Sequence, residues 1–151
     1  MSHKYCFNFF SSELEFVFEN PLNKESVIEI VKIIEILQNE LDIYKTNSPA
    51  NSFLNAQKNI PISTTLTFIE FLKINISLYS FGFMPFGEEF EKEDLSILST
   101  NKYLLKKTPA KNFLQLKRGF VVKVLLDWLE ETQNFNYQIF WSDFKVTCQN
   151  N

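Results

Sequence analysis

The stretch Leu114-Gln115-Leu116-Lys117-Arg118-Gly119-Phe120-Val121-Val122-Lys123 decides the fold that we expect. It has the pattern of a strand, a sharp turn and the start of an amphipathic helix, and a final apolar strand follows at Tyr137 to Val146, interrupted by Asp143. Because a helix N-terminus presents free N–H groups and the positive end of its dipole, such turns often bind phosphate. Gly119 is the single glycine of this turn. The sequence therefore predicts the layout of a nucleotide site without most of its usual small residues.

Composition limits the class of protein. The chain has 151 residues, of which 45% are hydrophobic and 17 are phenylalanine, so it is long enough for one domain with a dense aromatic core. Its 15 Lys and Arg and 18 Asp and Glu give a net charge of −3, and the scattered basic residues argue against nucleic acid as a partner. No secretion signal and no apolar run of about 18 residues is present. We therefore expect a cytoplasmic protein with no membrane partner.

Side chains that carry chemistry are few. His3 is the only histidine, and its place in a terminal segment argues against a hydrolytic triad. Cys6 and Cys148 lie near opposite ends of the chain, which argues against a zinc site or a redox pair. The acidic segment between Phe83 and Asp94 is typical of a solvated loop, because a metal site would need its carboxylates on rigid elements.

Three places in the last third of the chain keep alternative interpretations. Lys117 and Arg118 fit either a phosphate clamp beside the helix start or ordinary surface charge. Asp143 fits either a ligand to magnesium or ribose or a strand acid facing solvent. Trp141 fits either a core or interface residue or a stacking platform. The residues alone do not choose between these pairs.

The expected architecture is α+β, with three main helices packed on one side of a mostly antiparallel sheet. Alternation predicts a hairpin in which Leu14, Phe16 and Phe18 share a buried face. A helical stripe follows the cap Asn23. The predicted elements are strands at Tyr5 to Phe10 and Leu14 to Phe18, a helix from Asn23 to about residue 44, a loop at Lys45 to Pro61, a helix at Thr64 to Ser80 capped by Ser63 and stopped by Gly82, strands at Tyr103 to Lys107 and Asn112 to Leu116, a helix at Phe120 to Glu131 and the final strand at Tyr137 to Val146.

The order of these elements resembles the N-terminal half of the FAD:protein FMN transferase family, enzymes that attach FMN covalently to a threonine of a target flavoprotein. Tyr44-Lys45-Thr46-Asn47-Ser48 and Ser52-Phe53-Leu54-Asn55-Ala56 look like the family's Tyr-Arg-Pro-Asp-Ser and Ser-Arg-Leu-Asn signature. Ser12 to Phe18 stands where the family has its opening Met-Gly-Thr strand. Lys117 to Lys123 is similar to its Lys-Gly-Tyr-Ala-Val-Asp helix start, and Phe140 to Val146 stands where it has a strand ending in Gly-Gly-Asp.

The resemblance implies an FAD site that has degenerated. It places cofactor-binding roles on Ser52, Asn55, Lys117, Gly119 and Asp143. The family's glycine-rich approach Gly-Gly-Ile-Ala-Lys-Gly keeps one glycine here, its Gly-Gly before the acid has become Trp141-Ser142, and Phe53 and Lys123 replace an arginine and an acid. The half of the family fold that supplies magnesium ligands lies beyond Asn151. We therefore expect no catalytic residue, no metal site and no bound cofactor, with at most a remnant of the FAD and magnesium site.

Three hypotheses for function follow. In the first, residues 1–151 form a single truncated flavin-transferase-like domain without catalysis, which binds another protein chain or itself through Phe10, Phe140 and Phe144. In the second, the chain is a minimal magnesium-dependent flavin transferase completed by a partner or across a dimer. In the third, it is a small acidic inhibitor or immunity-type protein. The first also predicts that Trp141 is buried in the space that the family leaves for the nucleotide.

Overall fold

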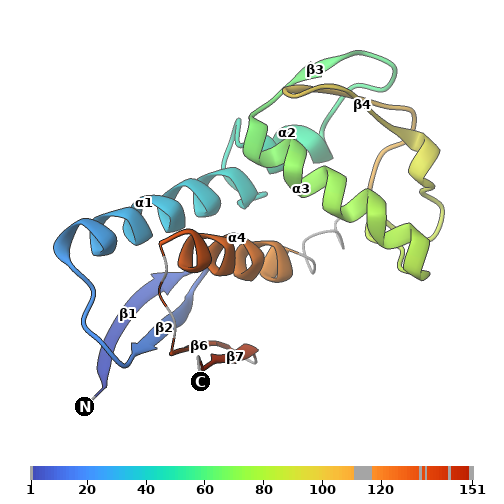
Figure 1. Cartoon of the computed structure of the whole chain (residues 1–151). Helices are drawn as coiled ribbons and strands as arrows, with labels where there is room; N and C mark the ends of the chain where they lie inside the picture. Colours follow the sequence, from blue (N-terminus) through green and yellow to red (C-terminus); the bar gives the residue numbers. More distant parts are fainter. Residues whose placement is uncertain (1, 111–116, 133, 135, 143, 150–151) are drawn as a thin grey trace. The chain divides into compact units, whose positions relative to one another are not determined.

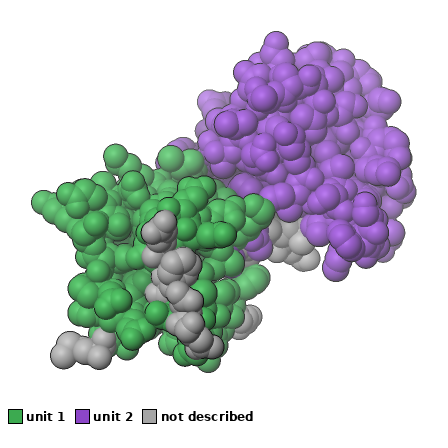
Figure 2. Space-filling model, viewed as in Figure 1, with its two compact units in different colours: residues 1–38, 123–151 green, residues 39–122 purple. Residues whose placement is uncertain are grey.

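The protein forms two compact units. The structure, a computed structural model, describes residues 2–110, 117–132, 134, 136–142 and 144–149. Unit 1 combines residues 1–38 with 123–151, and unit 2 comprises residues 39–122 (Figure 2). Both boundaries fall within helices, since α1 spans Lys24–Leu41 and α4 spans Lys117–Glu131. Unit 1 is therefore built from the two ends of the sequence.

A four-stranded antiparallel sheet organises unit 1. Its strands are β1 (His3–Phe9), β2 (Ser12–Phe18), β6 (Tyr137–Trp141) and β7 (Phe144–Cys148), in the order β1-β2-β6-β7 (Figure 1). β1 and β2 confirm the predicted hairpin, and Phe10 and Ser11 form its two-residue turn with φ of 49° and 63°. Positive φ at both positions matches the twist of the two strands. Within the described residues, β1 and β7 are the edges of this sheet.

One face of the sheet carries the core of unit 1. Leu14, Phe16 and Phe18 are buried, as their alternation predicts, while Glu13 on the opposite face is exposed. The parts of α1 and α4 that belong to unit 1 lie over one face of this sheet (Figure 1). Trp128 of α4 donates a hydrogen bond from Nε1 to Glu29 Oε2 of α1 at 2.9 Å, which ties the two helices together. The helices bury Ile30, Ile34, Leu37, Leu125 and Leu129.

The predicted final strand is wrong in one respect, because the run from Tyr137 to Val146 is a hairpin. β6 ends at Trp141 and β7 begins at Phe144, and these two residues pair. Ser142 has φ of 53°, a left-handed conformation that turns the chain. Apolar residues stand on both sides of Ser142 and Asp143, so the pattern fits one strand interrupted by polar residues as well as it fits a hairpin.

Unit 2 contains a small antiparallel sheet, packed with helices around an aromatic core. The strand order is β3-β5-β4, with β3 at Ile62–Ser63, β5 at Lys102–Leu105 and β4 at Leu95–Ser99. The helices are α2 (Pro49–Leu54) and α3 (Leu66–Ser77), and α3 continues into the 3₁₀ turn η1 (Leu78–Phe81); a second 3₁₀ turn, η2, spans Lys92–Asp94. Phe53 lies at the centre of the core, with ring centroids 5.4 Å from Phe86, 5.5 Å from Tyr103 and 5.7 Å from Phe68.

Several predicted boundaries in unit 2 need correction. The predicted loop from Lys45 to Pro61 contains α2, and Thr65 rather than Ser63 caps α3 by accepting from Phe68 N–H at 3.1 Å. Gly82 does end the helical segment, with φ of 82°. α1 ends at Leu41, which leaves Tyr44 beyond the helix and exposed.

The helices and strands of the described chain confirm the predicted α+β fold class. The described chain is α+β with antiparallel strands and three main helices, α1, α3 and α4, although its strands divide between two sheets. The predicted strand at Asn112 to Leu116 lies outside the described residues. None of the described helices is long and apolar enough to cross a membrane.

Candidate functional site

Polar side chains build the segment that joins α1 to α2. Asp42 Oδ1 accepts from Tyr44 N–H at 2.9 Å, and Asn51 Nδ2 donates to the Ile43 carbonyl at 2.8 Å. Ser48 is buried, donates from Oγ to the Asp42 carbonyl and accepts from Asn51 N–H at 3.0 Å. An N-cap of this kind satisfies a free N–H group of the helix. The side chains of Ser48 and Asn51 therefore hold the backbone in place.

A cleft of about 430 Å³ lies beside this segment in unit 2. Asn55, one of the predicted cofactor residues, lines it at the C-terminal end of α2 and donates from Nδ2 to the Asn51 carbonyl at 3.0 Å. Tyr44 lines it with an almost fully exposed ring. An aromatic face, an amide and a hydroxyl can stack on and hydrogen-bond a planar ligand. The described residues that line it are Ile43, Tyr44, Asn51, Leu54, Asn55, Thr108 and Pro109.

The other predicted cofactor residues do not gather at this cleft. Ser52 lies within α2 and is not among the lining residues, and its N–H donates to the Ser48 carbonyl at 2.9 Å as part of the helix. The side chain of Lys117 and the whole of Asp143 lie outside the described part of the chain. Asn55 is thus the one predicted residue that the described structure places at a cavity.

Gly119 lies within the first turn of α4, which begins at Lys117, three residues before the predicted helix start at Phe120. The prediction of a strand-to-helix turn at Gly119 is therefore wrong. A Cβ atom added at Gly119 would have no atom within 4 Å, and its φ lies outside the left-handed region. Neither backbone strain nor close packing requires glycine here. The predicted start of the helix came too late because Lys117 and Arg118 belong to the first turn of α4.

Trp141 is a core residue. Only 1% of it is exposed, and its ring centroid lies 5.0 Å from that of Phe9. The predicted burial of Trp141 is confirmed. The resemblance aligns Trp141 and Ser142 with two family glycines, and Trp141 is a bulky residue at the first of these positions. These residues do not fit the FAD site that the resemblance implies.

Among the described residues, one group could offer three ligands to a metal. The ligand atoms of Cys6, Glu13 and Glu15 lie within 4.8 Å of one another on the β1–β2 hairpin. Lys4 Nζ already lies 3.1 Å from Glu15 Oε1. Loss of solvation, followed by a hydrogen bond with Glu13, raises the pKa of the Cys6 thiol, which favours the protonated form that metals do not bind. None of these residues belongs to the predicted site.

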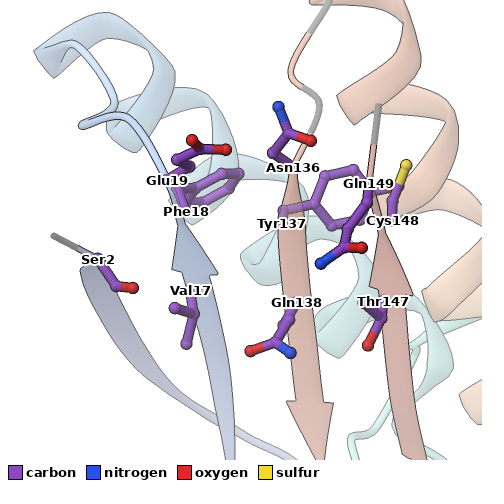
Figure 3. A pocket seen from close by; sticks show the side chains of 10 residues that line it. All are labelled: Ser2, Val17, Phe18, Glu19, Asn136, Tyr137, Gln138, Thr147, Cys148 and Gln149. Atoms are coloured by element: carbon purple, nitrogen blue, oxygen red, sulfur yellow. The ribbon is translucent and has the colours of Figure 1, made fainter. Parts of the chain in front are cut away.

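Sequence reasoning missed a polar pocket of about 500 Å³ in unit 1 (Figure 3). Two cross-strand rows line it, one from Phe18 through Tyr137 to Cys148 and one from Val17 through Gln138 to Thr147. Burial, and then the nearby Cys148 thiol, raise the pKa of Tyr137 to about 12, so its phenol stays protonated at neutral pH. The remaining lining residues are Ser2, Glu19, Asn136 and Gln149.

The chemistry of this pocket is hydrogen bonding. Amides and hydroxyls make up most of its described lining, beside one thiol and one carboxylate. The alternation of Gln138 with the buried Tyr137 and Ile139 is the sequence signal that could have revealed part of the row. The register of β2 against β6 was also needed, and no local pattern carries it.

Comparisons with known proteins identify the fold. No protein-family model matches the sequence, and neither does any curated protein. The flavin transferase ApbE from Vibrio cholerae is similar in structure, with a TM-score of 0.77 and 13% identity over 100% of this chain and 61% of that one. The flavinyl transferase ApbE from Pseudomonas stutzeri, in its apo form, gives 0.76 and 14% over 97% and 60%. The ApbE protein from Thermotoga maritima gives 0.70 and 9% over 93% and 57%.

These similarities confirm the predicted resemblance as a likeness of fold. The chain has a flavin-transferase-like fold and spans about 60% of the length of the solved structures that it matches. At 9–14% identity the likeness concerns the path of the backbone and carries no residue roles.

Proposed function

We propose that this flavin-transferase-like module, residues 1–151, binds another protein chain and does not itself transfer FMN. The observation that carries the proposal is the burial of Trp141. A dinucleotide needs small residues where backbone and pyrophosphate approach each other. Here Trp141, which the resemblance aligns with a family glycine, is an indole with 1% exposure in the core of unit 1.

The residues around the other resembling stretches support the same proposal. Ser48 and Asn51 use their side chains to hold α2, and Gly119 stands in a regular helical turn. At α2 the Ser48 side chain takes up a free N–H group of the helix, and this segment has no glycine-rich turn of the kind that cradles a pyrophosphate. The α2 stretch therefore uses the side chains of Ser48 and Asn51 to hold its own backbone.

The sheet of unit 1 offers a surface for association. β1 and β7 are its edges within the described residues, and edge strands present backbone groups that another strand can pair with. Phe144, on β7, is an exposed large hydrophobic residue, and Phe10 and Phe140 are partly exposed. These three aromatic residues support binding to a second chain or to another copy.

A flavinylation assay tests the lack of transfer. The purified chain is incubated with FAD, magnesium and a target flavoprotein domain, and covalent flavin on the target is read from in-gel fluorescence and mass. The Vibrio cholerae flavin transferase, assayed in parallel, is the positive control. We expect a colourless protein and no flavin on the target. Magnesium-dependent flavinylation by this chain alone would overturn the proposal.

The cleft at Tyr44 and Asn55 favours a second candidate, a flavin transferase whose site a partner or a second copy completes. Its exposed aromatic ring and amide are suited to one end of a flavin nucleotide. Titration of FAD with the chain, followed by flavin fluorescence, tests this candidate. Binding that is lost in both Tyr44→Ala and Asn55→Ala, and kept in the exposed control Ile60→Ala, would favour it over the non-catalytic function.

A further inference from the structure

Three large apolar side chains are exposed together where η1 ends in unit 2. Phe81 is 75% exposed, Phe83 57% and Met84 56%. Single exposed apolar residues are common on protein surfaces, but a contiguous group marks a surface for interaction. We call the segment Phe81–Met84, which contains these three residues and Gly82, the apolar turn.

Hydrogen bonds fix the backbone of the apolar turn. Gly82, with φ of 82°, donates from N–H to the Tyr79 carbonyl at 3.1 Å, and Phe83 N–H donates to the Leu78 carbonyl at 3.2 Å. This pair of bonds is the Schellman arrangement that closes a helix around a left-handed glycine. Gly87 N–H then donates to the Met84 carbonyl at 3.2 Å. The exposed side chains therefore project from a defined turn.

An acidic segment follows the apolar turn. Glu88, Glu89, Glu91 and Glu93 are all exposed. The Tyr79 hydroxyl, from the turn's own 3₁₀ segment, donates to the Phe90 carbonyl at 2.9 Å and so joins the two. Burial, and then the nearby carboxylates of Glu91, Asp94 and Glu93, raise the pKa of Tyr79 to about 12, which agrees with their closeness.

Negative charge exceeds positive charge around this segment. Lys58 and Lys107 line a cleft together with Glu88 and Glu89, so these lysines and Lys92 stand against the five carboxylates between Glu88 and Asp94. Lys107 Nζ donates to the Glu89 carbonyl at 3.0 Å and lies 4.0 Å from Asp94 Oδ2. Lys92 is the only cation within the acidic segment. The surface therefore combines exposed apolar groups with an excess of negative charge, and its complement is both apolar and positive.

We infer that the apolar turn and the Glu88–Glu93 segment form one docking surface for a cationic amphipathic segment of another protein. Such a segment places bulky apolar side chains on Phe81, Phe83 and Met84 while its Lys and Arg residues face the carboxylates. An anionic membrane does not fit, because the glutamates would be repelled by its headgroups. A second copy would bring the same negative charge. The inference concerns unit 2 and does not depend on the proposed function.

Two labelled peptides test the inference with the full chain. One is a helical peptide of Lys and Leu with one apolar face, and the other has the same pattern with Glu in place of Lys. Fluorescence anisotropy gives the affinity of each peptide at low and high salt. We expect binding of the Lys peptide alone, and about tenfold weaker binding in the variant Phe83→Ser, as for loss of an interface anchor. Leu66→Ser, at the other end of α3, is the matched exposed apolar control and should leave affinity unchanged.

Charge variants separate the electrostatic contribution. Glu88→Gln combined with Glu89→Gln should weaken binding of the Lys peptide several-fold and reduce its salt dependence. Glu25→Gln combined with Glu35→Gln, on the exposed face of α1, should change neither. Equal binding of the two peptides, or full affinity in both Phe83→Ser and the Glu88/Glu89 variant, would overturn the inference. Association with anionic vesicles that Phe83→Ser weakens would also overturn the inference. A dimer that Phe83→Ser dissociates would overturn it as well.

Discussion

Trp141 has the largest of the fully buried side chains in the described core. Its indole packs on Phe9 with centroids 5.0 Å apart and lies 6.5 Å from the ring of Phe144. Removing a buried tryptophan loses its burial and leaves a void, so Trp141→Ala should lower the free energy of unfolding by about 3–5 kcal/mol. Urea unfolding measures this loss. Phe83→Ala, at an exposed site, should stay within about 0.5 kcal/mol of the natural chain. An unchanged urea midpoint for Trp141→Ala would contradict the core role.

The glycines at 82 and 119 predict opposite effects for the same substitution. Gly119→Ala meets no neighbouring atom and removes a poor helix former from α4, so it should raise stability by about 0.5 kcal/mol. Gly82→Ala has equal space but φ of 82°, and should lower stability by about 1 kcal/mol. Thermal unfolding of both variants compares the two effects directly. Destabilisation by Gly119→Ala would show that this glycine has a structural role after all.

At the scale of elements, α2 depends on its cap more than on its own sequence. Six residues are too few for a stable isolated helix, and Ser48 both caps it and bonds to the Asp42 carbonyl. Ser48→Ala should lower the free energy of unfolding by about 1–2 kcal/mol. Thr65→Ala, which removes the single cap bond of the longer α3, should cost about 1 kcal/mol or less. Denaturant midpoints of the two variants test the order, and a larger loss at Thr65 would refute it.

At the scale of the whole molecule, buried phenols set a limit on alkaline stability. Burial raises the pKa of Tyr79 and Tyr137 to about 12, and it also raises the pKa of Tyr103. In the unfolded chain these tyrosines ionise at about pH 10. Proton loss above that pH therefore favours the unfolded state, so stability is complete below about pH 10 and falls as the pH rises toward 12.

Urea midpoints between about pH 8 and about pH 11, with phenolate absorbance, test the alkaline loss. Tyr79→Phe loses the bond to the Phe90 carbonyl at every pH but should show a smaller fall. Tyr44→Phe, at an exposed ring, should leave the fall unchanged. A midpoint that is constant over this range would exclude the burial effect.

We expect the protein to associate with another copy or with a partner. Light scattering at micromolar concentration should give a mass above the 17.8 kDa of one chain, or a pull-down from native cell extract should recover a partner. The interface should bury at least about 1,000 Å². Phe144→Lys should weaken association because it places a charge on the β7 edge, whereas Leu98→Lys, exposed in unit 2, should not. A strictly monomeric mass with no recovered partner would leave the proposed binding role without support.

Elements with local sequence signals could be predicted from the amino-acid sequence alone. The alternation of Leu14, Phe16 and Phe18 predicted a strand with one buried face, and Asn23 with its following stripe predicted the start of α1. Asn23 Oδ1 indeed accepts from Ser26 N–H at 2.8 Å. Periodicity and capping act over a few residues, so these features can be read without knowledge of the fold. The family resemblance extended this to the fold class.

Other features, namely β3, α2 and the pocket at Tyr137, depend on contacts that form only in the folded protein. β3 has two residues and exists because β5 pairs with it, and α2 forms on a cap that depends on the Asp42 carbonyl. The pocket at Tyr137 needs β2 to pair with β6 across more than a hundred residues of chain. Such pairing depends on side chains far apart in sequence that meet only in the folded core, and no local pattern encodes it. The sequence could therefore name Asn55 as a candidate, but the cleft around it was decided by the fold.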